Sequence, residues 1–201
     1  MSFWSRFCPR RQRRLLTLGV YIDSKEYDGL LDAPLAGAEL FGVRPGDDCR
    51  LDQARLILKY AGAHPGENIP VTVSGISLAG AQARNYRVGL VTSDPAGKVA
   101  VPVTGSMDVR HLVASFTASD KPYDGNTIAQ IGPVTLVGDM PADPRGVLPS
   151  DDCSLVFTGA SFDTPDPGTG KTVTLDGASL QGAQAGYYYL QDVSATATIL
   201  P

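Results

Sequence analysis

The sequence is poor in the residues from which active centres are usually built. It holds two histidines, His64 and His111, three cysteines and one tryptophan. His64 lies in a Pro-Gly turn and His111 opens the second half of the chain, so we expect neither a shared metal site nor a catalytic triad. No cysteine has a histidine near it that would activate its thiol. We therefore expect a non-enzymatic protein that uses no metal or other cofactor.

The cysteines do not form the pattern of a disulfide framework. Their number is odd, and two of them end the matching Asp-Asp-Cys segments at residues 47–49 and 151–153. Equivalent positions of two successive domains lie too far apart for a disulfide bond, so we expect Cys49 and Cys153 to be small buried strand residues. The paired aspartates could also bind calcium between domains. The Asp-x-Asp-x-Asp alternation of calcium loops is missing, which favours loop acids beside a strand.

No hydrophobic run is long enough to cross a membrane as a helix. The apolar run near the N-terminus, residues 15–22, ends at Asp23. A signal peptide needs a longer apolar core and a small-residue cleavage site. A twin-arginine export signal, from the pairs at residues 10–11 or 13–14, meets the same objection. We therefore expect no membrane span and see no clear export signal.

The net charge of −4 is spread unevenly, with +5 on the first fourteen residues and −9 on the rest. The acidic body is not expected to bind nucleic acid, which only the basic arm, residues 1–17, could do. Three interpretations of the arm stay open: a polar tail, a cleaved targeting segment, and a docking arm with aromatic anchors and arginines that face an acidic surface. The candidate assembly contacts of the third are Trp4, Arg6, Phe7, Arg10, Arg11, Arg13 and Arg14.

What the sequence does contain is an internal repeat. The segment VTVSGISLAGAQARNYRVGL at residues 71–90 returns as VTLDGASLQGAQAGYYYLQD at residues 173–192, with ten identities at an offset of 102. Repetition at one offset indicates two domains of the same kind, and 201 residues suit two domains of roughly 80–100 residues each.

High glycine and proline contents, 22 and 15 residues, and short alternating apolar segments predict many short strands joined by turns. We expect a first domain at residues 18–103, a linker with an opening strand at 104–118, and a second domain at 119–201. The spacing predicts two tandem immunoglobulin-like antiparallel β-sandwich domains. The expected strands lie at residues 19–23, 38–43, 54–60, 69–73, 85–88, 99–103, 108–118, 134–138, 154–161, 172–175, 187–190 and 195–200, of which 54–60 would also pass for a short helix.

Residues 165–172, PDPGTGKT, come close to a phosphate-binding loop. That motif needs a glycine where Pro165 stands and a helix after the lysine. The sequence instead continues as a strand through residues 173–175, so no cradle of helix N-terminal amides forms. We therefore expect no nucleotide binding.

Several motifs follow one another in a fixed order. They are Tyr-Asp-Gly at residues 27–29 and 123–125, Gly-Asp-Asp or Ser-Asp-Asp at 46–48 and 150–152, Gly-Thr-Gly-Lys-Thr-Val-Thr at 168–174, Leu-x-Gly-Ala-x-Ala-x-x-Tyr at 78–86 and 180–188, and Thr-Ala-Thr-Ile at 196–199. This order resembles the YDG domain, which repeats along large bacterial surface adhesins of the filamentous-haemagglutinin type. The resemblance runs over residues 24–103 and 119–201, although Gly-Glu-Asn-Ile at 66–69 replaces the Gly-Thr-Gly-Lys piece in the first copy. It implies an all-β stalk or display module without catalysis, and it carries over no binding residues.

Tyrosines are the remaining candidates for contacts. Those of the motifs, at positions 27, 86, 123 and 188, are interpreted as rings in the core with hydrogen-bonded hydroxyls. Successive residues of a strand point to opposite faces, so an inward Tyr188 leaves Tyr187 and Tyr189 exposed as candidate contacts.

Two hypotheses for the function follow. The first is a structural subunit on the surface of a larger assembly such as a phage virion, a decoration or tail/capsid accessory protein anchored by its basic arm. It rests on the small number of repeats, the lack of a clear signal and the arm itself. The second is a bacterial cell-surface or secreted adhesin fragment, which rests on the resemblance. In both, we expect capsid, tail or surface proteins, or another copy of the chain, as partners, and a location on a virion or outside the cell.

Overall fold

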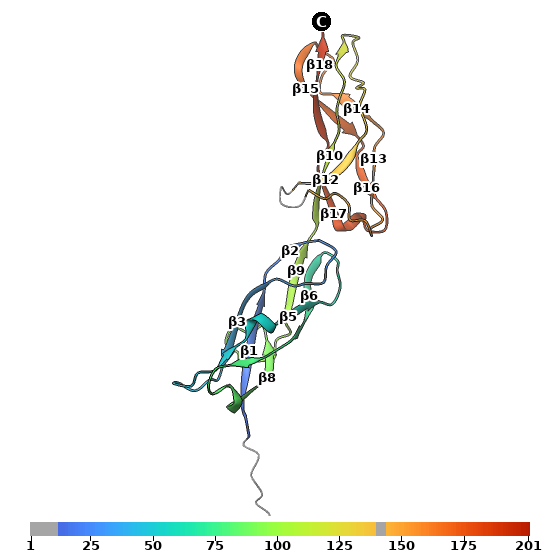
Figure 1. The fold of residues 1–201 in the computed structure, drawn as a ribbon. Helices are drawn as coiled ribbons and strands as arrows, with labels where there is room; N and C mark the ends of the chain where they lie inside the picture. Colours follow the sequence, from blue (N-terminus) through green and yellow to red (C-terminus); the bar gives the residue numbers. More distant parts are fainter. Residues whose placement is uncertain (1–11, 140–143) are drawn as a thin grey trace, which may run out of the picture. The chain divides into compact units, whose positions relative to one another are not determined.

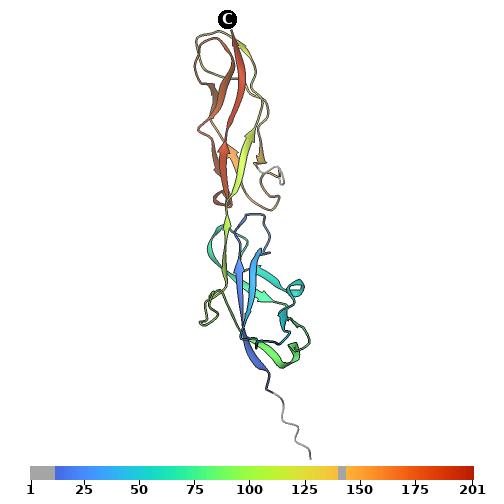
Figure 2. The same ribbon diagram turned by 90° about the vertical axis from the view of Figure 1, so that its left-hand side faces the viewer.

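The computed structural model describes residues 12–139 and 144–201, and there the chain forms β-strands joined by turns and short 3-10 helices. It divides into two compact units (Figures 1 and 2). Unit 1 comprises Met1–Lys25 and Leu30–Met107, and unit 2 comprises Glu26–Gly29 and Asp108–Pro201. This confirms the expected all-β fold in two parts. No helix of the described ranges is long and apolar enough to cross a membrane.

Two sheets and a short pair of strands build the first copy of the repeat, in the orders β3-β1-β8, β2-β9-β6-β5 and β4-β7. The strands are β1 (Arg14–Ile22), β2 (Lys25–Glu26), β3 (Leu35–Phe41), β4 (Arg50–Leu51), β5 (Ile57–Tyr60), β6 (Gly66–Ser74), β7 (Leu78–Ala79), β8 (Tyr86–Thr92) and β9 (Thr104–Asp108), with 3-10 helices η1 (Gln53–Arg55) and η2 (Ala83–Asn85).

The second copy repeats this topology strand for strand, in the orders β12-β10-β17, β11-β18-β15-β14 and β13-β16. Its elements are β10 (Arg110–Ser115), β11 (Lys121–Pro122), β12 (Thr135–Gly138), β13 (Ser154–Val156), β14 (Gly159–Phe162), β15 (Gly168–Asp176), β16 (Ser179–Gln181), η3 (Ala185–Tyr187), β17 (Tyr188–Asp192) and β18 (Ser194–Leu200).

The first strand of each copy pairs in both directions. Strand β1 is antiparallel to β3 and parallel to β8, which run beside it in Figure 1, and β10 is antiparallel to β12 and parallel to β17. The sheets are therefore mixed, not purely antiparallel as expected. Side chains alternate in the same way in both kinds of ladder, so the sequence pattern carried no information on strand direction. The immunoglobulin-like arrangement stays a prediction.

Alternating apolar residues fill the core of each unit. In unit 1, Leu16, Leu18 and Val20 of β1 are at most 2 % exposed. In unit 2, Val173 and Leu175 of β15 are at most 3 % exposed and belong to one apolar cluster with residues of β14 and β18. This period of two is the pattern that a strand with one buried face requires.

The boundaries differ from the expected ones at two places. Strand β1 starts at Arg14, so residues 14–17 belong to a sheet, not to the arm. The expected linker does not stand apart either, because β9 pairs with β6 and the boundary between the units falls after Met107.

The expected strand at residues 99–103 is wrong. Val99 and Val101 are 58 % and 40 % exposed, and the Thr92 hydroxyl holds this segment by donating to the Val99 carbonyl at 2.9 Å and accepting from the Val101 amide at 3.0 Å. The closing strand is β9, whose sequence is TGSMD. Alternating valines imitate a strand more strongly than these small and polar residues do.

Glycine is required at a pair of equivalent positions in the two copies, Gly80 and Gly182, where φ is +108° and +126°. A Cβ atom there would collide with the carbonyl oxygen of Asp48 or of Asp152. Positive φ and close approach of two backbones together need a residue without a side chain.

We predict that Gly182→Ala lowers the free energy of unfolding by about 1–3 kcal/mol, the usual cost of a strained backbone conformation. The matched control is Gly186→Ala, because a Cβ at Gly186 meets nothing within 4 Å. That control should stay within about 0.5 kcal/mol of the wild type in urea unfolding. Equal stability of the two variants would contradict the requirement for glycine.

Candidate functional site

In both copies, the equivalent strand begins with a tyrosine whose hydroxyl is hydrogen-bonded to an aspartate. Tyr86 opens β8, and its hydroxyl donates to Asp47 Oδ2 and accepts from the Arg44 amide at 3.2 Å. Tyr188 opens β17, and its hydroxyl donates to Asp151 Oδ2 at 2.6 Å and accepts from a backbone amide at 3.0 Å. The first aspartate of each Asp-Asp pair therefore anchors the start of a strand.

The second aspartate of each pair joins the same two loops through backbone groups. The Asp48 amide donates to Gln82 Oε1 at 2.9 Å, and Asp48 Oδ2 accepts from the Ala81 amide at 3.0 Å. The second copy repeats both bonds at 3.0 and 3.1 Å, with Asp152 and Gln184. Within the described residues, no group of three or more His, Cys, Asp or Glu side chains could hold a metal ion.

A second tyrosine shares the carboxylate of unit 2. Tyr27 belongs to the tetrapeptide Glu26–Gly29 of that unit, is 3 % exposed, and donates its hydroxyl to Asp151 Oδ2 at 2.8 Å. Its ring meets those of Tyr187 and Tyr188 edge-on, with centroids 5.2 and 5.9 Å apart, an arrangement that aromatic rings favour. Burial first, and the bond to Asp151 second, raise the pKa of Tyr27 and Tyr188 well above the ordinary value.

Arg110 holds the backbone of the same tetrapeptide. Its side chain is 3 % exposed, and its guanidinium donates to the Tyr27 carbonyl at 3.4 Å and lies 3.8 Å from the Glu26 carboxylate. It also donates to the carbonyls of Arg145 and Gly146 at 2.6 and 3.1 Å. A buried charge needs this many partners, because an uncompensated one is strongly destabilising.

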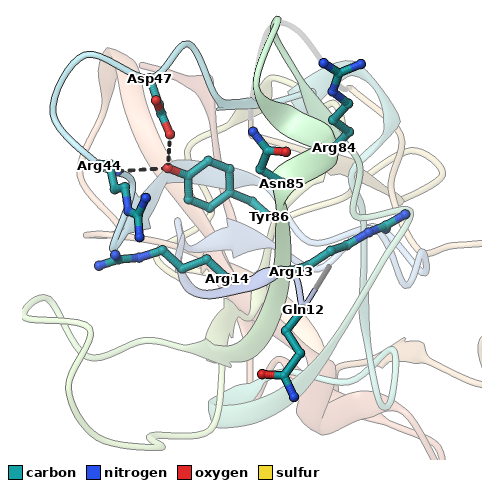
Figure 3. A pocket seen from close by; sticks show the side chains of 8 residues that line it. All are labelled: Gln12, Arg13, Arg14, Arg44, Asp47, Arg84, Asn85 and Tyr86. Atoms are coloured by element: carbon teal, nitrogen blue, oxygen red, sulfur yellow. Dashed lines mark hydrogen bonds between the residues drawn. The ribbon is translucent and has the colours of Figure 1, made fainter. Parts of the chain in front are cut away.

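The equivalent place in unit 1 is a pocket of about 640 Å³ (Figure 3). Arg14 stands opposite Tyr86 in the β1–β8 ladder, as Arg110 stands opposite Tyr188 in the β10–β17 ladder. In Figure 3, Arg14 and Arg44 lie on the same side of the Tyr86 ring. The pocket is rich in positive charge, because four of its eight lining residues are arginines. They are Gln12, Arg13, Arg14, Arg44, Asp47, Arg84, Asn85 and Tyr86.

Comparison with known families agrees with the two copies. A sequence profile of the YDG domain matches residues 12–96 and 110–197. The chain belongs to the YDG domain family. No curated protein and no solved structure matches it at a significant level. Each YDG match includes the first strand of its copy, β1 or β10, which the sequence resemblance had left out.

The YDG tyrosines do not all behave as expected. Tyr27, Tyr86 and Tyr188 are at most 6 % exposed with bonded hydroxyls, but Tyr123 is 55 % exposed, so its assignment to the core is wrong. Its loop nevertheless matches the other, because Tyr27 N donates to Asp108 O at 2.9 Å and Tyr123 N to the Leu200 carbonyl at 2.8 Å. The motif therefore determines the backbone conformation of both loops. Whether the tyrosine ring is buried depends on which other residues pack against it.

The cysteines of the two YDG copies are free, as Cys49 and Cys153 form no disulfide. They are half-buried and precede β4 and β13, so they are loop residues and not the buried strand residues that we expected. Burial first, and the neighbouring aspartates next, raise the pKa of both thiols. A raised pKa leaves little thiolate, which makes both cysteines poor nucleophiles.

The remaining candidates lie apart from one another. Tyr189 is 56 % exposed beside His111, whereas Tyr187 is half-buried against Tyr27. Arg13 and Arg14 are exposed and line the pocket. The arm candidates outside the described residues are Trp4, Arg6, Phe7, Arg10 and Arg11.

Sequence reasoning missed the role of Arg110. A signal was present, since Arg14 and Arg110 stand 96 residues apart, the same offset as between Tyr27 and Tyr123. That offset differs from the 102 of the main repeat, so the two arginines do not align with each other in that repeat.

We predict a loss of stability at alkaline pH that depends on the tyrosine pair. Above pH 10 or so, unfolded tyrosines lose protons while the raised pKa keeps Tyr27 and Tyr188 protonated in the folded state. Their contribution is therefore complete below that pH and falls as the pH rises, by up to about 1.4 kcal/mol per pH unit for each group. Urea unfolding between neutral and alkaline pH measures it.

The double variant Tyr27→Phe/Tyr188→Phe should show a shallower alkaline decline than the wild type, because it lacks both ionising hydroxyls. Tyr189→Phe is the matched control, since Tyr189 is exposed. If the double variant declines as steeply as the wild type, the pair is not responsible.

Proposed function

We propose that the chain is a non-enzymatic display module of two tandem YDG domains, part of a bacterial cell-surface or secreted protein of adhesin type. One observation carries this proposal: the polar residues of the YDG motifs bind one another and the backbone in both copies. Asp47, Asp48 and Gln82 serve the loops of the first copy, as their counterparts serve the second. Polar residues used in this way stabilise the fold of each copy, which supports a structural role for them.

The surface setting is preferred because it rests on the YDG copies themselves, which the family match supports. The virion setting rested on a docked arm, and residues 1–11 of that arm lie outside the described structure. Contacts with a ligand would fall to exposed groups such as Tyr189. The proposal thus includes both a location at the cell surface or outside the cell and a ligand that contacts exposed side chains.

Fractionation of the source tests the setting. Cells, medium and any particles are separated on a density gradient, and the chain is located by mass spectrometry. We expect it in the envelope fraction or the medium, with a cytosolic enzyme as the marker for leakage. Co-migration with capsid or tail proteins would reject the surface setting in favour of the virion subunit.

A further inference from the structure

Both copies contain the same tyrosine–aspartate site, but among the described residues a Tyr-Asp-Gly loop is bound to it only in unit 2. In unit 2, Asp151 and Tyr188 hold the Tyr-Asp-Gly loop at residues 27–29. In unit 1, the equivalent residues Asp47 and Tyr86 line a pocket. The other Tyr-Asp-Gly loop, at residues 123–125, presents an exposed ring.

We propose that the unit 1 pocket binds the Tyr-Asp-Gly loop of a second copy of the chain, in the way that unit 2 binds Tyr27. Copies would then join head to tail, with Tyr123 of one against Asp47 and Tyr86 of the next. This inference does not depend on whether the protein belongs to a cell surface or a virion.

The loop is already shaped for binding. Its glycine has the same φ of +77° as the glycine of the loop that unit 2 holds. Lys121 Nζ fixes the loop by donating to Asp124 Oδ1 and the Asn126 carbonyl, both at 2.8 Å, and to the Ile128 carbonyl at 3.1 Å. A preformed loop loses little conformational entropy when it binds.

The pocket supplies the matching groups. A carboxylate has about four lone-pair sites, and Asp151 Oδ2 already accepts two tyrosine hydroxyls, at 2.8 and 2.6 Å. Asp47 holds Tyr86 in the same way and lines the pocket, so it can accept the hydroxyl of Tyr123 as well. Arg14, at the ladder position of Arg110, is placed to donate to the carbonyl of the incoming tyrosine.

Two differences make this binding weaker than its counterpart. Asn85 stands where unit 2 has Tyr187, so one edge-on ring contact is lost. Pro122 precedes Tyr123 where Glu26 precedes Tyr27, so the ion pair with the arginine is lost. In unit 2 the loop and the site also belong to one polypeptide, which gives them a high effective concentration.

Sedimentation velocity on the full chain tests the proposal. Measurements extend to about 1 mM, the effective concentration that a short linker gives to joined modules. The wild type should form an open series of oligomers as its concentration rises, because a head-to-tail contact need not close. Tyr123→Ala, which lacks the ring, and Arg14→Glu, which alters the pocket, should each stay monomeric.

Mixing the two variants gives a stringent control. Tyr123→Ala keeps an intact pocket and Arg14→Glu keeps an intact loop, so the mixture should form dimers and nothing larger. Both altered side chains are exposed, and circular dichroism checks that each variant is folded. Tyr189→Ala, which removes an equally exposed tyrosine, should associate like the wild type.

A gain of affinity is also expected. Asn85→Tyr restores the ring that unit 2 has at Tyr187 and should tighten association roughly 2–10-fold, the range that one aromatic pair gives. A wild type that stays monomeric over the whole concentration range overturns the proposal. So does an association that survives Tyr123→Ala, because the contact would then lie elsewhere.

Discussion

Two adjacent aspartates hold each copy of the repeat together. The first carboxylate accepts a tyrosine hydroxyl, and the second accepts a backbone amide while its own amide donates to a glutamine. Hydrogen bonds to a charged acceptor are roughly twice as strong as neutral ones, so this short segment fixes two loops at once. The close approach of the two loop backbones requires glycine at Gly80 and Gly182. It also positions the tyrosine at the start of β8 or β17, the strand that runs parallel to the first strand of its copy.

The same frame acts differently in the two units because of one arginine. Arg110 is buried, and its charge is stable there only with the carbonyls and the carboxylate around it, two of which belong to Glu26 and Tyr27. The tetrapeptide is therefore part of the electrostatic balance of unit 2. Arg14 has the same ladder position but is exposed to water, which satisfies its charge. The arginine of unit 2 therefore depends on the tetrapeptide for part of its compensation, whereas the arginine of unit 1 has water as a partner.

Local features of the fold could be predicted from the sequence, whereas features that depend on contacts between distant residues could not. Alternation located β6 and β18, and the repeat located two all-β units, because a half-buried strand must alternate and equal sequences fold alike. Strand direction, the small residues of β9 and the exposure of Tyr123 were missed, since each depends on a neighbour distant in sequence. The membership of Tyr27 in unit 2 was beyond local reasoning for the same reason.

A repeated domain benefits when the site that binds a loop of another copy is weaker than the site that binds a loop of its own chain. A head-to-tail contact that does not close on itself extends without limit when it is strong, which turns a free protein into fibres. In unit 2 the extra ring of Tyr187 and the carboxylate of Glu26 act within one polypeptide, where strength adds stability and no aggregation. With Asn85 and Pro122 at those places, the proposed contact between copies is weak in dilute solution. We expect it to become effective only where many copies are held close together.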